Sequence, residues 1–162
     1  MKTITLMRHG KSSWEYDVSD DKRPLKSRGK NDAELVAKRF KILNKIPIDA
    51  IYSSYAKRAQ DTCLIFSRVM DFEASKINVR DDLYDFSGGA VLKAIKSFDA
   101  SLEHVAIFGH NYAFTSLVNM LGSKYLDNLP TSGLASINFN ADNWSDISSG
   151  ETAMLLFPKE LR

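Results

Sequence analysis

The chain has 162 residues, of which 44% are hydrophobic and 26% are charged, and its formal net charge is +2. This length suits one domain, over residues 1–162, and the nearly balanced charge gives no global indication of nucleic acid or a membrane as a partner. The single cysteine excludes an internal disulfide, and no run approaches the roughly 20 apolar residues of a membrane span or resembles a signal peptide. We therefore expect a cytoplasmic protein, and a monomer by default.

The first predicted strand comprises residues 3–8 and leads directly into His9 and Gly10. The arginine at its end, Arg8, is suited to bidentate binding of phosphate or carboxylate, and a glycine lets the backbone approach a ligand closely. The end of this strand is therefore a candidate anion site.

Helix and strand patterns alternate over most of the remaining chain. Apolar spacing predicts helices from near Gly29 to before Pro47, over about 57–69, from Ser87 as the cap through Ile95, and over 113–121. Strands are predicted at 48–53, 76–79, 104–108, 134–139 and 151–157. This order predicts an α/β fold, a three-layer α/β/α sandwich with a mostly parallel sheet, helices on both faces and a final antiparallel pair.

Three of the predicted strands are followed by residues that suit an anion. The first ends in Arg8 and His9, Arg58 lies about one helical turn beyond the second, and the strand at 104–108 is followed by His110 and Asn111. Because the carboxyl ends of parallel strands share one edge of a sheet, these residues converge on one crevice. Guanidinium groups match the oxygens of a phosphoryl group, and a neutral imidazole can attack phosphorus. We therefore expect one neutral and one cationic histidine there.

These segments, in this order, resemble the histidine phosphatase superfamily, which has the phosphoglycerate mutase-like fold. The resemblance lies in Arg8-His9-Gly10, Ser54-x-x-x-Arg58-Ala59-x-x-Thr62 and Gly109-His110-Asn111. The short chain, the continuation Lys11-Ser12-Ser13-Trp14 and the Arg23-Pro24-Leu25 segment with Gly29 resemble the small SixA-type phosphohistidine phosphatases.

The resemblance implies a role for each matching residue. His9 would be the nucleophile that becomes phosphorylated, and Arg8, Arg58 and His110 would hold the transferred phosphoryl group. Ser12 lies where the mutases also have a serine near the pocket, and we place Asn111 with it among the substrate-binding candidates.

Two carboxylates depart from the family pattern. Asp85, in Leu83-Tyr84-Asp85-Phe86, is the candidate general acid, and a cap or loop carboxylate is the alternative. Glu15 stands where the mutases have a phosphate-binding asparagine. The resemblance implies a cofactor-independent and metal-free phosphatase. Its substrate is phosphohistidine on a protein or, alternatively, a small phosphoester.

Other function classes fit the sequence less well. Cys63 and Arg68 are separated by four residues, one fewer than in the Cys-x5-Arg loop of the cysteine phosphatases, and no zinc-ligand spacing or Gly-x-x-x-x-Gly-Lys-[Ser/Thr] loop occurs. The chain has no room for the insertions that enclose a sugar phosphate in the mutases. A phospho-ligand binding module stays open as the non-enzymatic alternative. We interpret the basic run at 22–30 as a solvated face at the pocket rim, because aspartates flank it and no aromatic residues interleave.

Overall fold

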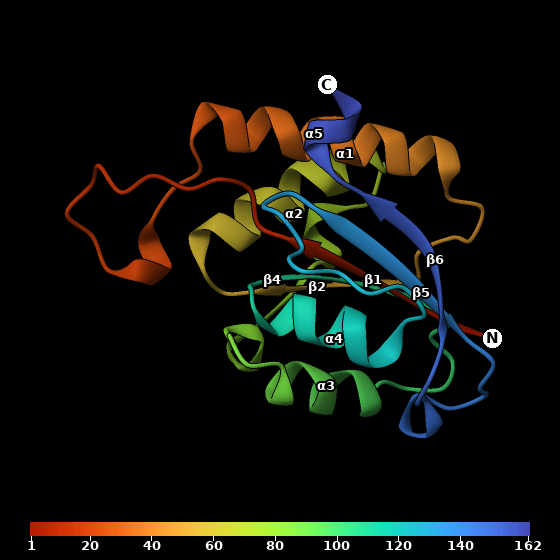
Figure 1. The fold of residues 1–162 in the computed structure, drawn as a ribbon. Helices are drawn as coiled ribbons and strands as arrows, with labels where there is room; N and C mark the ends of the chain where they lie inside the picture. Colours follow the sequence, from red (N-terminus) through yellow and green to blue (C-terminus); the bar gives the residue numbers. More distant parts are fainter.

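The computed structural model describes residues 1–162 and contains a six-stranded sheet with helices on both faces (Figure 1). The strands are β1 (Lys2–Arg8), β2 (Ala50–Ser54), β3 (Asn78–Arg80), β4 (His104–Gly109), β5 (Leu134–Phe139) and β6 (Glu151–Leu156). The helices are α1 (Ser27–Leu43), α2 (Lys57–Val69), α3 (Gly89–Lys96), α4 (Ala113–Leu121) and α5 (Pro158–Leu161). The predicted fold class is confirmed.

The sheet has the strand order β3-β2-β4-β1-β5-β6. Strands β1 to β4 are mutually parallel, and β5 runs antiparallel to both β1 and β6, so the predicted antiparallel closing pair is confirmed. From β1 the chain crosses to β2 on one side, whereas from β4 it crosses to β5 on the other. The gap between the carboxyl ends of β1 and β4 is thus the switch point at which α/β sheets bind ligands.

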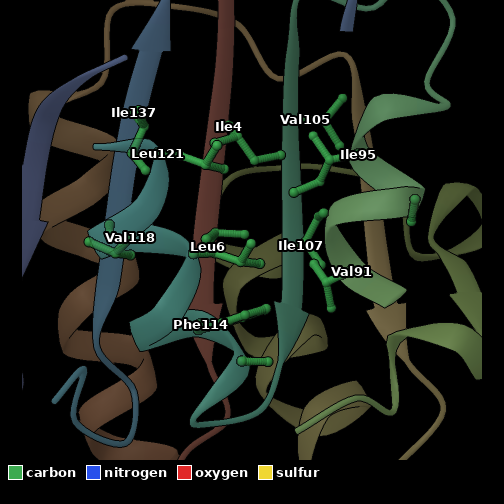
Figure 2. Packing of buried hydrophobic residues seen from close by; sticks show 14 of the residues in the cluster. Ile4, Leu6, Val91, Ile95, Val105, Ile107, Phe114, Val118, Leu121 and Ile137 are labelled. Atoms are coloured by element: carbon green, nitrogen blue, oxygen red, sulfur yellow. The ribbon is translucent and has the colours of Figure 1, made fainter. Parts of the chain in front are cut away.

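Side chains alternate between two cores, one on each face of the sheet. Ile4 and Leu6 of β1 and Ile107 of β4 belong to the larger cluster under α3 and α4. Figure 2 shows α4 and α3 covering these strands with Phe114, Val118 and Val91. The neighbouring residues of β4, Ala106 and Phe108, instead join the smaller cluster under α1 and α2. This period of two is the one expected of a sheet that is buried on both faces.

The main difference from the sequence prediction is the start of α3. Ser87 does not cap this helix; Gly88 precedes it in the left-handed region (φ 109°), and the carboxylate of Asp85 accepts hydrogen bonds from the backbone N–H groups of Gly88, Ala90 and Val91. A carboxylate accepts these bonds and favours the positive end of the helix dipole more strongly than a serine hydroxyl does. The short α5 was not predicted. No helix combines the length and apolar character needed to cross a membrane.

Between β1 and α1 the chain makes a long excursion beyond the carboxyl ends of the strands (red to orange in Figure 1). A bridge between Ser12 and Leu25 closes its base. There Gly10 and Gly29 bring two backbones into direct contact: a Cβ on Gly29 would lie 2.3 Å from the carbonyl oxygen of Lys11, and one on Gly10 would lie 2.7 Å from that of Gly29. Helix α1 therefore fixes the backbone that follows His9.

This contact predicts that Gly29→Ala destabilises the protein by about 1–3 kcal/mol, because the added methyl group forces the two backbones apart. Gly89→Ala is the matched control, since no atom lies within 4 Å of a Cβ there. Urea unfolding of both variants measures the effect. Equal stability of the two variants would contradict the packing described here.

Candidate active site

An open cleft of about 340 Å³ lies at the carboxyl ends of β1, β2 and β4. It is lined by Arg8, His9, Lys11, Ser12, Trp14, Asp20, Arg23, Arg58, Phe86, Asn111 and Thr131. The register pairs Arg8 of β1 with Gly109 of β4, so the residues that follow these two strands meet at the switch point. The structure therefore brings the three chain segments together, as predicted.

His9 lies at the floor of the cleft with both ring nitrogens in defined contacts. Its Nδ1 lies 2.7 Å from the carbonyl oxygen of Gly10, which accepts a hydrogen bond, so Nδ1 carries the proton. Its Nε2 accepts a hydrogen bond of 3.3 Å from Nε of Arg58. Burial, and then the positive charges nearby, lower the pKa of His9 to about 3. The imidazole is thus neutral at pH 7, with the lone pair of Nε2 directed toward Arg58.

Arg58, in the first turn of α2, is 2% exposed and has a partner for each nitrogen of its guanidinium. Besides the bond from Nε to His9, Nη1 donates to the backbone oxygen of Asp20 (2.6 Å) and Nη2 donates to its carboxylate (2.9 Å). A buried cation is costly unless it is paired, and Asp20 provides that pairing. Arg58 is therefore held against His9 from one side and against the excursion from the other.

Arg8 enters the cleft from the end of β1 and retains an unused donor. Its Nη1 donates to the carbonyl oxygen of Leu129 (2.9 Å), whereas its Nε is buried without a hydrogen-bond partner. Burial lowers the pKa of Arg8 from its ordinary value. An orphaned donor next to a neutral imidazole is a ready contact for an anionic oxygen.

His110 follows β4, and its ring centroid lies 5.3 Å from that of His9. Its Nε2 lies 2.8 Å from the hydroxyl oxygen of Ser54, and its Nδ1 is buried without a partner. Burial, and then the charge of Arg58, lower the pKa of His110 to about 3. The expectation of one neutral and one cationic histidine is therefore wrong for the free protein, because both rings are buried and lie among cations. A bound phosphoryl dianion would raise the pKa of His110.

Asp20 and Arg23 belong to this site and were not identified from the sequence. Arg23 was assigned to a solvated basic face, but it is 7% exposed, donates from Nη1 to the hydroxyl of Ser12 (2.7 Å) and stacks on Trp14 (3.6 Å to the ring centroid). Its Nε donates to the carboxylate of Asp20 (3.1 Å). Apolar periodicity could not identify these residues, because they lie in the irregular segment between β1 and α1. Only the tertiary fold brings that segment back to the cleft.

The carboxylate of Asp20 lies among donors. It accepts hydrogen bonds from Tyr84 Oη, Arg58 and Arg23. Burial raises the pKa of Asp20, but these hydrogen bonds outweigh burial and lower the pKa to about 2. Asp20 is thus ionised at pH 7, and it is the one carboxylate among the residues that line the cleft.

The predicted substrate-binding residues Ser12 and Asn111 both line the cleft, although their polar groups are largely engaged. The hydroxyl of Ser12 accepts from Arg23. The side-chain oxygen of Asn111 accepts from the backbone and hydroxyl of Thr115, and its amide nitrogen donates to Asn128. Glu15 is not among the lining residues.

Asp85, the candidate general acid, instead caps α3, which is the alternative that the sequence left open. Burial raises its pKa, but hydrogen bonds from the backbone of Val91, Ser87 and Gly88 outweigh burial and lower it. An ionised carboxylate whose oxygens are taken up by a helix end is a poor proton donor.

Two reactive side chains lie outside the cleft, as expected. His104 is fully buried and lies within hydrogen-bond distance of Thr5 and of the backbone oxygen of Ile46, so it is structural. Cys63 is buried in α2, where burial raises the pKa of its thiol to about 12. No group of three or more His, Cys, Asp or Glu side chains is placed to hold a metal ion.

Comparison with known proteins gives a family and close structural relatives. Residues 4–94, more than half of the chain, match the family model described as histidine phosphatase superfamily (branch 1). Among curated proteins, the chain is similar to an uncharacterized protein of Mycobacterium tuberculosis, with 27% identity over 161 residues that cover 93% of this chain and 98% of the relative.

Solved structures resemble the fold over nearly its whole length. The protein histidine phosphatase SixA, solved with tungstate, has a TM-score of 0.83, 23% identity and 99% coverage of both chains. A protein from Agrobacterium tumefaciens, provisionally assigned as a SixA phosphohistidine phosphatase, has a TM-score of 0.80, 25% identity and coverage of 97% of this chain and 98% of that one. A phosphoserine phosphatase from Entamoeba histolytica, solved with 3-phosphoglyceric acid, has a TM-score of 0.67, 16% identity and 100% coverage of both chains.

The lowered pKa values predict how stability depends on pH. The pKa of His9 and His110 is about 3 in the folded protein, against an ordinary 6.5. The unfolded chain therefore binds protons below pH 6.5 that the folded protein rejects, so stability is full above that pH and is lost as the pH falls toward 3. Each group contributes at most about 1.4 kcal/mol per pH unit.

We expect the unfolding free energy in urea to fall between about pH 7 and pH 5, a range above most carboxyl titrations. In the double variant His9→Gln, His110→Gln, the unfolding free energy should fall clearly less with decreasing pH, because His104 is then the one remaining histidine that titrates. An identical slope in the two proteins would show that these imidazoles are not the buried neutral groups described above.

Proposed function

Because the chain belongs to the histidine phosphatase superfamily and is a phosphoric ester hydrolase, we propose that it hydrolyses phosphohistidine on a protein through a covalent intermediate on His9. The proposal rests on the groups that surround the neutral imidazole of His9. Nε2 of His9 lies 3.3 Å from Nε of Arg58, and the ring centroid of His110 lies 5.3 Å from that of His9. Arg8, whose Nε has no hydrogen-bond partner, lines the same cleft as His9.

The first step transfers the phosphoryl group to His9. The lone pair of Nε2 forms a bond to phosphorus while the bond from phosphorus to the leaving group breaks, and the electron pair of that bond stays with the leaving group. Arg58 turns its Nε from His9 to a phosphoryl oxygen, and Arg8 Nε and His110 donate to the others, so the spread charge meets positioned donors. The carbonyl of Gly10, which accepts from Nδ1, favours the positive charge that develops on the ring.

Water completes the reaction. Its oxygen bonds to phosphorus, the bond to Nε2 breaks, and the electron pair returns to the ring of His9. The proton of the water passes to solvent, and inorganic phosphate leaves. The open cleft supports this second step, because bulk water reaches the phosphorylated ring without a lid.

The state of the carboxylates supports phosphohistidine as the substrate. A leaving group such as an alkoxide needs a protonated acid at neutral pH, yet hydrogen bonds lower the pKa of both Asp20 and Asp85. A phosphohistidine ring that carries a proton on its other nitrogen leaves as neutral imidazole, so it needs little help from an acid of the protein. An open cleft also admits a side chain on a protein surface.

The alternative substrate is a small phosphoester. The fold is shared with the phosphoserine phosphatase of Entamoeba histolytica and with a mycobacterial glucosyl-3-phosphoglycerate phosphatase, which are 16% and 12% identical. Turnover of phosphohistidine peptides and of a panel of small phosphoesters, compared by kcat/KM, decides between the two classes. We place the enzyme in the cytoplasm, since its one cysteine is a free, buried thiol.

We predict that His9→Ala abolishes turnover of an aryl phosphate and of a phosphohistidine peptide, because the group that bonds to phosphorus is lost. When the reaction of the wild-type protein with either substrate is quenched at alkaline pH, His9 should carry a phosphoryl group that mass spectrometry detects. The assay is run with a chelator, since no step uses a metal ion. Turnover by the alanine variant would rule out the covalent mechanism, and phosphate binding without turnover by the wild type would favour the binding module.

We also predict that Arg8→Ala, Arg58→Ala and His110→Ala each lower kcat by about a hundredfold or more, as expected for the loss of a transition-state donor. Arg68→Ala is the matched control, because Arg68 is an exposed arginine on the same helix as Arg58. Steady-state kinetics with an aryl phosphate measures all four variants. A residue whose loss matches the control has no role in holding the phosphoryl group.

A further inference from the structure

A second hollow of about 200 Å³ opens beside the catalytic cleft. We call it the basic hollow; its polar lining consists of Lys11, Arg28, Asp32, Thr131, Lys159 and Arg162. Lys11 and Thr131 also line the cleft, so the two spaces adjoin. A substrate bound at His9 would therefore have to reach only past Lys11 and Thr131 to place a group in the basic hollow.

The side chains that line the basic hollow carry more positive than negative charge. Its one side-chain carboxylate, that of Asp32, binds Arg162 in a bidentate pair (3.2 and 2.8 Å) and lies 3.7 Å from Nε of Arg28. Neither Lys11 nor Lys159 has a carboxylate within 4.0 Å. Two ammonium groups are thus left without a counter-charge around a space large enough for a carboxylate or a phosphate.

Buried groups hold this arrangement in place. Asp32 is 7% exposed, and from α1 it fixes the guanidinium fork of Arg162, just beyond α5 (Figure 1). The wall shared with the cleft is attached to the proposed nucleophile, because the backbone N–H of Ser132 donates to the carbonyl oxygen of His9 (3.0 Å). Ser132 is fully buried with φ 60°, a conformation that persists only where the surroundings impose it. The backbone of this wall is therefore fixed relative to His9, and the exposed lysine and arginine side chains of the basic hollow extend from it and from its neighbours.

Resting on the proposed function, we propose that the basic hollow is an anion subsite for the same substrate whose phosphoryl group reacts at His9. Its ligand is an acidic group that the substrate carries close to the phosphorylated position. In a protein substrate this is the carboxylate of a neighbouring aspartate or glutamate; in a small substrate it is a second phosphate. Lys11, between the two spaces, contacts both groups.

This position predicts an effect on binding rather than on chemistry. The acidic group lies away from the phosphorus atom, so its contacts are equal in the ground state and the transition state. Such uniform binding lowers KM and leaves kcat nearly unchanged. The subsite thus selects substrates by the charge next to their phosphoryl group.

The test compares matched pairs of substrates. One pair is a phosphohistidine peptide with aspartates beside the phosphorylated residue and the same peptide with asparagines; the other is an alkyl bisphosphate and its monophosphate. The variant Arg28→Glu, Lys159→Glu reverses the charge of the basic hollow outside the catalytic cleft. The control Lys96→Glu, Lys124→Glu makes the same charge change on exposed residues elsewhere.

We expect the wild type and the control to prefer the acidic member of one pair by about three- to fivefold in kcat/KM, mainly through KM, and the basic-hollow variant to lose this preference. If the variant loses the preference within the peptide pair, the substrate is a protein. If it loses the preference within the bisphosphate pair, the substrate is a small molecule. A variant that keeps the preference, or a wild type with none for either pair, overturns the subsite. Failure of the proposed function looks different, since the wild type then shows no His9-dependent turnover even of an aryl phosphate.

Discussion

The burial of Arg58 beside two imidazoles is the constraint on which the site depends. A guanidinium that is 2% exposed must be paired, and the fold pairs it with Asp20 from an excursion that follows β1 rather than with a neighbour on its own helix. Burial above all, with the positive charge of Arg58 added to it, keeps His9 and His110 neutral. The placement of Arg58 thus reinforces the neutral state of both histidines, and its pairing with Asp20 ties the excursion to α2.

The sheet determines why these groups meet. Arg8 and His9 follow β1, and His110 follows β4, its parallel neighbour, and the connections from these two strands diverge to opposite faces. The divergence leaves a gap at the strand ends that no helix fills. Close packing of Gly10 against Gly29 then holds the turn after His9. The reactive ring is therefore supported by backbone contacts, whereas its charged partners Arg8 and Arg58 are side chains held by hydrogen bonds to Leu129 and Asp20.

Much of the fold and of the candidate site could be predicted from the sequence, because regular apolar spacing is typical of regular helices and strands. The bounds of α2 and α4 follow from apolar spacing, and parallel strand ends predicted the meeting of Arg8, His9, Arg58 and His110. Arg23 and Asp20 were missed, since nothing local shows that an irregular excursion folds back onto a cleft. The protonation of His110 was predicted wrongly for a related reason: it depends on the sum of burial and charges from distant segments. The capping role of Asp85 was an open alternative that only the path of the chain before α3 decides.

The hydrogen bond from Arg58 to Nε2 of His9 has one more consequence. The atom that would attack phosphorus is masked by the very cation that attracts the substrate, so stray electrophiles without negative charge find the lone pair already occupied. In the proposed mechanism, an incoming phosphoryl group draws the guanidinium of Arg58 onto its own oxygens and so uncovers Nε2 of His9. On that proposal, the hydrogen bond shields the nitrogen from adventitious acylation or alkylation until an anion binds.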